Sequence, residues 1–139
     1  MKEKVNSPKD LVECIEWYLT KVPLEELEHF KNSKSSDIFH HTTGRGIRND
    51  WNLWNKESEL HKFFLSIGIW HADDMSGIIL DTLHRILNRR PIELKDQVEW
   101  YKKYWKQYVD CSKIYLDNEK INLNYTTDEK YTLNTVKLK

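Results

Sequence analysis

The sequence has few of the residues that cross-link, bend or interrupt a chain. It contains two cysteines, four glycines and three prolines in 139 residues. Cys14 and Cys111 are too far apart in the chain to give a metal-binding spacing or a disulfide framework. We therefore expect both thiols to be small buried core residues. A chain of this length fits one domain and can bury a core without disulfides or bound metal.

The chain also lacks a net charge and any long apolar run. Its 22 Lys and Arg residues balance 22 Asp and Glu residues, which argues against nucleic-acid binding, because a phosphate backbone attracts a basic excess. Apolar runs are as short as residues 78–80, whereas a membrane span needs about 20 residues. The polar segment 1–9 does not look like a secretory signal. We expect a soluble, cytoplasmic protein that binds no membrane and no cofactor.

Aromatic residues, in contrast, are abundant. They make up 12% of the chain, with six tryptophans, and a composition of this kind argues against disorder. Apolar positions recur at helical spacing, which predicts a mainly α protein, a compact bundle of five or six helices. Ser7 and Pro8 have the features of a helix start, and Pro23 ends that helix. Further helices are expected over 24–30, 37–50, 57–67, 71–89 and 94–116.

The pattern changes near the C-terminus. Apolar and polar residues alternate over 121–125 and again over 131–133, which predicts a small β-hairpin. An isolated hairpin is only marginally stable, so this segment either packs on the helices or forms a flexible tail. We divide the chain into a helical domain, residues 1–118, and a C-terminal appendage, residues 119–139.

A first cluster of polar residues lies in the segment 39–54. On a helix, His41, Arg45 and Arg48 share one face, with Asn49 beside them. Two arginines one turn apart form a donor surface that fits a carboxylate or a phosphate, and a histidine can carry a proton. The same pattern also fits a solvated helix face, or arginines that pair with acidic residues in the core.

Two glycines and an aspartate bear on this choice. Gly44 and Gly46 predict a close approach of the backbone to a neighbour, or a bend. Asp50 falls among the apolar positions Ile47 and Trp51, which predicts a buried carboxylate with an Arg or Trp partner. Both features favour a packed polar interior, but they fit a structural network as well as a binding site.

A second cluster lies in the helix that is predicted to begin at His71. Asp81 and His84 are three residues apart, so we expect them to share a hydrogen bond. His71, Asp73 and Asp74 have the atom types of metal ligands or acid–base groups, but their spacing matches no metal motif, and we predict no metal site. The plainer interpretation is that Asp73 caps the helix, Asp74 pairs with an arginine and His84 lies on the surface.

The two clusters together predict a contact in the core. Arg45 and Arg48 would meet Asp73 and Asp74, and such buried pairs persist only when every charged group has a partner. Aromatic residues of the segment 94–116, interleaved with lysines, fall largely on one helix face. We expect these rings to pack in the core rather than to stack on nucleic-acid bases.

The same residues resemble an uncharacterised bacterial domain family. The resemblance rests on the motif G-R-x-I-R-N-x-W-x-L-W at residues 44–54 and the motif H-A-D-D-M-S at residues 71–76, followed by His84 and Arg85. It covers about residues 37–90. The resemblance implies a bacterial or phage origin and no particular activity.

Two functions remain open. In the first, the protein is a binding or interaction module for a protein partner or a small anionic ligand, and the arginines of the first cluster supply charge. In the second, it is a small hydrolase-like enzyme in which Asp73 or Asp74 and His71 or His84 act as acid and base. The lack of an activated nucleophile favours the first. The candidate site residues are His41, Arg45, Arg48, Asn49, His71, Asp73, Asp74 and His84.

Overall fold

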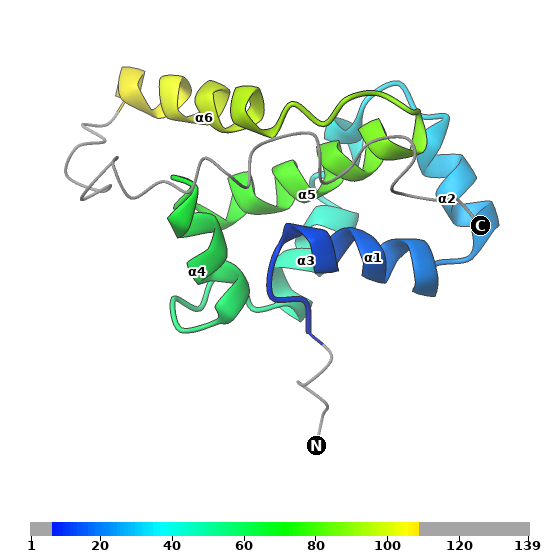
Figure 1. The fold of residues 1–139 in the computed structure, drawn as a ribbon, viewed down its shortest axis with the longest axis horizontal. Helices are drawn as coiled ribbons and strands as arrows, with labels where there is room; N and C mark the ends of the chain where they lie inside the picture. The colour runs from blue at the N-terminus through cyan, green and yellow to red at the C-terminus, as the bar shows by residue number, and fades with distance from the viewer. Residues whose placement is uncertain (1–6, 109–139) are drawn as a thin grey trace.

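In a computed structural model the described residues, 7–108, form an all-helical fold (Figure 1). Its elements are α1 Leu11–Lys21, α2 Leu24–Lys31, the 3₁₀-helix η2 Ser36–Phe39, α3 Thr43–Asp50, α4 Glu59–Ser66, α5 Ala72–Leu87 and α6 Leu94–Tyr108. The predicted mainly α fold is confirmed. The predicted β-hairpin, the end of the last predicted helix and Cys111 lie outside the described residues.

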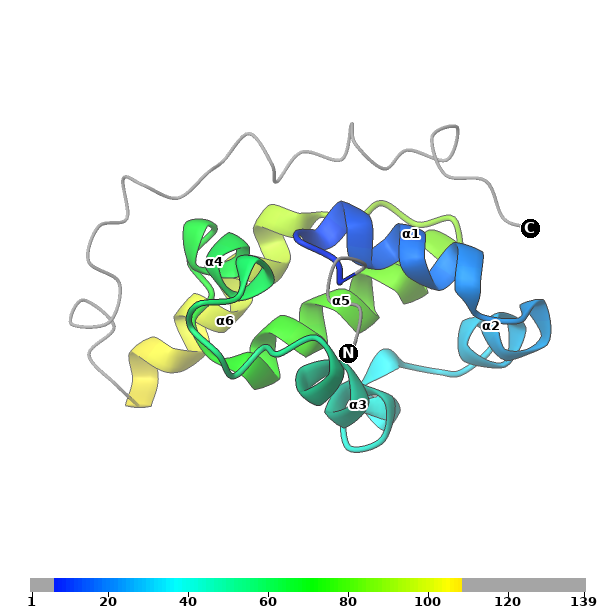
Figure 2. The same ribbon diagram turned by 90° about the horizontal axis from the view of Figure 1, so that it is seen from below.

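Helix α5 is the centre of the fold. It packs against η2 and against every other helix. Figure 1 shows α6 on one side of α5 and α1 and α3 on the other, and both views place α2 and α4 near opposite ends (Figure 2). The side chains of Met75, Ile78 and Ile79 are fully buried. A helix that is apolar on most of its faces is stable only in an interior, so the other helices form a shell around α5.

The start of α1 differs from the sequence prediction. The carboxylate of Asp10 accepts a hydrogen bond from the backbone N–H of Glu13 at 2.9 Å, and α1 begins at Leu11. The predicted start at Ser7 and Pro8 is therefore wrong. A carboxylate at this position accepts a hydrogen bond from one of the free N–H groups of the first turn. Its negative charge also interacts favourably with the positive end of the helix dipole.

The helix that was predicted over 37–50 is two elements. η2 ends at Phe39 and α3 begins at Thr43, because Thr42 has non-helical torsions, φ −112° and ψ −84°. The break leaves the carbonyl of His40 free to accept a hydrogen bond from Nη2 of Arg48 at 3.3 Å. Asp50, at the end of α3, is exposed, so the prediction of a buried carboxylate there is wrong.

The cysteine prediction is confirmed where the structure describes it. Cys14 is fully buried in α1, and burial raises the pKa of its thiol. The thiol therefore acts as a small apolar core residue. Within residues 7–108, no helix is both long and apolar enough to cross a membrane.

Candidate functional site

A cavity of about 450 Å³ lies where η2, α5 and α6 meet. Its lining combines acidic, imidazole and aromatic side chains. The carboxylates are those of Asp37, Asp73 and Asp74; the imidazoles are those of His40 and His71; the rings are those of Trp100, Tyr101, Tyr104 and Trp105. Three segments that are far apart in the sequence thus supply one wall each.

A glycine allows α5 and α6 to lie close together beside this cavity. A Cβ atom on Gly77 would lie only 2.6 Å from Oη of Tyr101, a separation that real Cβ atoms essentially never show. The side chain of Gln97 fixes the other end of the helix pair by donating to Oγ1 of Thr82 at 3.2 Å and to the carbonyl of Ile92 at 2.9 Å. Both features set the position of α6, and with it the position of the aromatic wall.

Asp74 is the most buried carboxylate of the cavity, with 8% of its surface exposed. Its Oδ2 accepts a hydrogen bond from Nε1 of Trp105 at 2.7 Å, which joins α5 to the far end of α6. Burial raises the pKa of Asp74, and the Trp105 hydrogen bond only partly opposes that shift. The charged form of Asp74 therefore gains from any cation that enters the cavity.

The raised pKa of Asp74 predicts how the stability of the protein changes with pH. The folded state keeps the proton of Asp74 to a higher pH than the unfolded state does. The stabilisation that Asp74 provides is therefore fully present below its ordinary pKa of 3.8, and it is lost as the pH rises through the pKa of Asp74 in the folded protein. Asp74→Asn cannot titrate, and its amide oxygen can still accept from Trp105. We expect the free energy of unfolding of the wild type, minus that of Asp74→Asn, to fall as the pH rises.

Denaturant unfolding of both proteins at a series of pH values between about 4 and 7 measures this difference. A difference that grows with pH would contradict the assignment, because it would mean that the folded structure favours the charged carboxylate.

Arg48 lies behind the cavity and belongs to the core. Only 6% of its surface is exposed. Nη1 donates to Oγ of Ser76 at 2.7 Å, and Nε lies 3.4 Å from Oδ1 of Asp73. A Cβ atom on Gly44 would lie 3.0 Å from Nη1 of Arg48, so the close approach predicted at Gly44 is present. The same test finds nothing within 4 Å at Gly46, so no close approach is present there.

The predicted arginine–aspartate contact is therefore formed in part. Arg48 reaches Asp73, whereas Arg45 is exposed and Asp74 bonds to Trp105 instead of to an arginine. Burial lowers the pKa of His40, and the charge of Arg48 adds to that shift. Each of the three guanidinium nitrogens of Arg48 contacts a protein group, and neither arginine lines the cavity.

His71 joins the cavity to an aromatic cluster. Its Nδ1 accepts the backbone N–H of Asp73 at 3.0 Å and so caps α5, a role that the sequence interpretation gave to Asp73. An Nδ1 that accepts this bond carries no proton, so its 3.9 Å approach to the Asp73 carboxylate is not an ion pair in this tautomer. The imidazole stacks on Trp105 at 5.8 Å and meets the edge of Trp54 at 5.7 Å.

The other predicted site residues lie away from the cavity. His41, Arg45 and Asn49 are exposed around α3 and line no part of it. The break at Thr42 separates His41 from α3, which carries Arg45, Arg48 and Asn49. On α3 itself only Arg48 is buried, whereas Arg45 and Asn49 are exposed.

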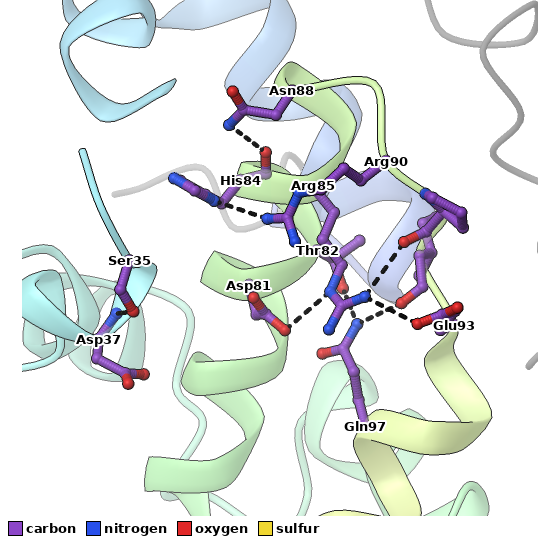
Figure 3. A network of polar contacts seen from close by, with 12 residues as sticks. Ser35, Asp37, Asp81, Thr82, His84, Arg85, Asn88, Arg90, Glu93 and Gln97 are labelled. Atoms are coloured by element: carbon purple, nitrogen blue, oxygen red, sulfur yellow. Dashed lines mark hydrogen bonds and ion pairs between the residues drawn. The ribbon is translucent and has the colours of Figure 1, made fainter. Parts of the chain in front are cut away.

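His84 is buried, 6% exposed, on another part of α5, so the prediction that it lies on the surface is wrong. Its predicted bond to Asp81 is wrong as well. Its Nε2 lies 3.0 Å from the carbonyl of Ser33, and Nη2 of Arg90 lies 3.1 Å from its Nδ1 (Figure 3). Asp81 pairs with Arg85 at 3.0 Å instead. Asp81 and Arg85 are one helical turn apart, and the attraction between their opposite charges favours this pair over a bond between Asp81 and His84. His84 therefore ties the loop after α2 to α5.

Several cavity residues were not among the predicted site residues: Ser36, Asp37, His40, Gly77, Leu80, Trp100, Tyr101, Tyr104 and Trp105. The helical periodicity of α6 assigned Tyr104 to the core, yet it is 42% exposed, and Trp100 is 61% exposed. The spacing of these two residues, one helical turn, is the signal that could have identified an aromatic face directed at a ligand. Within residues 7–108 there is no group of three or more His, Cys, Asp or Glu side chains that could hold a metal ion.

Comparison with known proteins places this fold in a family. A family model matches residues 7–87, the part of the chain that contains α1 to α5, and ends before α6 begins at Leu94. No curated protein and no solved structure matches the chain. The expected resemblance to an uncharacterised domain family is thus confirmed, while the two motifs and the bacterial origin stay predictions. Because the match covers more than half of the 139 residues, the chain belongs to the family described as Domain of unknown function (DUF6794).

Proposed function

We propose that this protein is a binding module whose cavity between α5 and α6 accepts a cationic group, an ammonium or a guanidinium, carried by a protein partner. One observation carries the proposal. The cavity surrounds the buried carboxylate of Asp74 with aromatic rings, and the described residues that line it include neither lysine nor arginine. Aromatic faces attract cations through the negative charge of their π surface, most strongly where water is excluded.

The geometry gives a cation more support than an anion. Arg48 is engaged by Ser76, His40 and Asp73, and Arg45 is exposed outside the cavity. An anion would instead meet the carboxylates of Asp74 and its neighbours, and like charges in a partly closed site repel. The hydrolase alternative also loses support, because its proposed anion clamp and His84 are both away from the cavity.

The proposal is tested with arginine amide and tetramethylammonium as probes and tryptophan fluorescence as the readout. We expect saturable binding of both cations. Asp74→Asn should weaken that binding about ten- to hundredfold, because a hydrogen bond or ion contact to a charged group contributes about 1.5–3 kcal/mol. The substituted side chain keeps an acceptor for Trp105, so circular dichroism should show an intact fold.

Asp50→Asn is the matched control, since it removes an exposed carboxylate of α3 that does not line this cavity. It should bind both probes as the wild type does. Equal weakening by the two variants would mean that general surface charge attracts the probes. If Asp74→Asn leaves the binding of both probes unchanged, the probes do not bind in this cavity and the proposal is wrong.

A further inference from the structure

The cavity does not end at Gly77. A second hollow of about 490 Å³ continues from it along the same helix pair. The two hollows share five lining residues: Ser36, Asp37, Gly77, Trp100 and Tyr101. Since one set of side chains forms a wall of both, the hollows are two halves of one groove between η2, α5 and α6. We call this the α5–α6 groove.

The groove is long enough for more than one side chain of a ligand. On α5 its lining runs from Asp73 to Arg85, twelve residues that rise about 18 Å along a helix. On α6 it runs from Asp96 to Trp105, nine residues that rise about 14 Å. The two helices are antiparallel, because the start of α5 meets the end of α6 at the Asp74–Trp105 hydrogen bond.

The second hollow also carries an excess of negative charge. Asp37, Asp81 and Asp96 line it, with Arg85 as the one basic side chain among its described residues. Arg85 is already engaged, at 3.0 Å from Asp81 and 3.3 Å from Glu93 (Figure 3). No ion pair within residues 7–108 uses Asp37 or Asp96.

Two exposed rings line the groove: Trp100 belongs to both hollows and Tyr104 to the first. Trp100 and Tyr104 are stacked, with centroids 5.8 Å apart and planes within 9° of each other. Tyr101, beside them, packs its hydroxyl against Gly77 and forms part of both hollows. Rigid aromatic side chains of this kind supply contact area at little cost in conformational entropy and are typical of protein-binding hot spots.

We infer that the α5–α6 groove binds an extended segment of a protein partner that carries two basic side chains, one for each hollow. This inference rests on the proposed function, which accounts for the first hollow alone. Charge complementarity favours a basic ligand, because carboxylates without an ion-pair partner lie in both halves of the groove. In a polyproline II segment, residues i and i+3 lie on one side about 9 Å apart. This is close to the rise of about 10 Å along α5 between Asp74 in the first hollow and Asp81 in the second.

The test compares two peptides at one fixed ionic strength: Ala-Arg-Ala-Ala-Arg-Ala, and the same peptide with the second arginine replaced by alanine. We expect the peptide with two arginines to bind about tenfold more tightly. Asp96→Asn should remove most of that advantage while it leaves binding of the single-arginine peptide unchanged, because Asp96 lines only the second hollow. Asp74→Asn should weaken both peptides, and Asp50→Asn neither.

The possible results separate the inference from the proposed function. If both peptides bind equally and Asp96→Asn has no effect, the groove inference is wrong. The proposed binding of a cation in the first hollow is then not contradicted. If neither peptide binds, the proposed function fails and the inference fails with it. Preferential binding of the corresponding glutamate peptide would show an anionic occupant and overturn both.

Discussion

Replacement of Arg48 by methionine is expected to lower the free energy of unfolding by about 2–4 kcal/mol. The methionine keeps much of the buried volume but removes the donors to Ser76 and to the carbonyl of His40. Asp73 adds little to this loss, because its carboxylate is 45% exposed and water can solvate it. Most of the loss comes from polar atoms that the core leaves without a partner. Urea unfolding monitored by circular dichroism measures the effect.

Arg45→Met is the matched comparison. Arg45 lies three residues before Arg48 on the same helix, but it is exposed. Substitution at such a surface position is expected to change stability by no more than about 0.5 kcal/mol. If the two variants were destabilised equally, Arg48 would not have the structural role that its contacts indicate.

Gly77→Ala is expected to destabilise the protein by up to about 2 kcal/mol, although alanine is the better helix former. The helix preference alone would stabilise α5 by about 1 kcal/mol. The new Cβ, however, would lie 2.6 Å from Oη of Tyr101, at the end of a rigid ring. Relief of that overlap requires α6 to move away from α5, and overpacking of this kind costs about 1–3 kcal/mol. The same movement should open the groove and weaken cation binding.

Tyr101→Phe provides the rescue. Without Oη, the nearest atom to the new Cβ is Cζ of the ring at 3.6 Å, an ordinary van der Waals distance. The double variant Gly77→Ala, Tyr101→Phe should therefore be more stable than Gly77→Ala alone, and a double-mutant cycle measures the coupling. Additive effects of the two substitutions would contradict the proposed steric contact.

Most of the helices were predictable from the sequence because they depend on local features. The apolar spacing around α5 and the position of Pro23 place their elements correctly. The start of α1 was missed because Ser7 and Asp10 are both good capping residues, and only the fold selects between them. The break at Thr42 was missed because a long-range bond from Arg48 to the carbonyl of His40 accompanies it.

The site was less predictable than the fold. Asp73, Asp74 and His71 were identified because they begin a helix together, and all three line the cavity. The aromatic wall was not identified, since a stripe of rings on α6 has the same spacing whether it packs in a core or lines a cavity. The choice depends on the packing of η2 and α6 against α5, which no local pattern encodes.

The family match includes only one side of the proposed cation site. It covers the α5 side of the cavity and ends at residue 87, whereas Trp100, Tyr101 and Trp105 belong to α6. The carboxylate of Asp74 thus lies inside the matched segment and the rings that face it lie outside. The proposed cation site needs both parts of the chain, so variants on α6 test it as directly as variants of Asp74 do.

The most direct test of the central claim is an NMR titration of the tryptophan indole N–H signals with arginine amide. Trp105 donates its indole N–H to Asp74 in the cavity, and Trp100 lines it. Trp17 and Trp51 pack on each other elsewhere in the fold and do not line it. A cation in the cavity should shift the signals of Trp105 and Trp100 with one common dissociation constant and leave those of Trp17 and Trp51 unchanged. Unchanged Trp105 and Trp100 signals at saturating arginine amide would contradict the account.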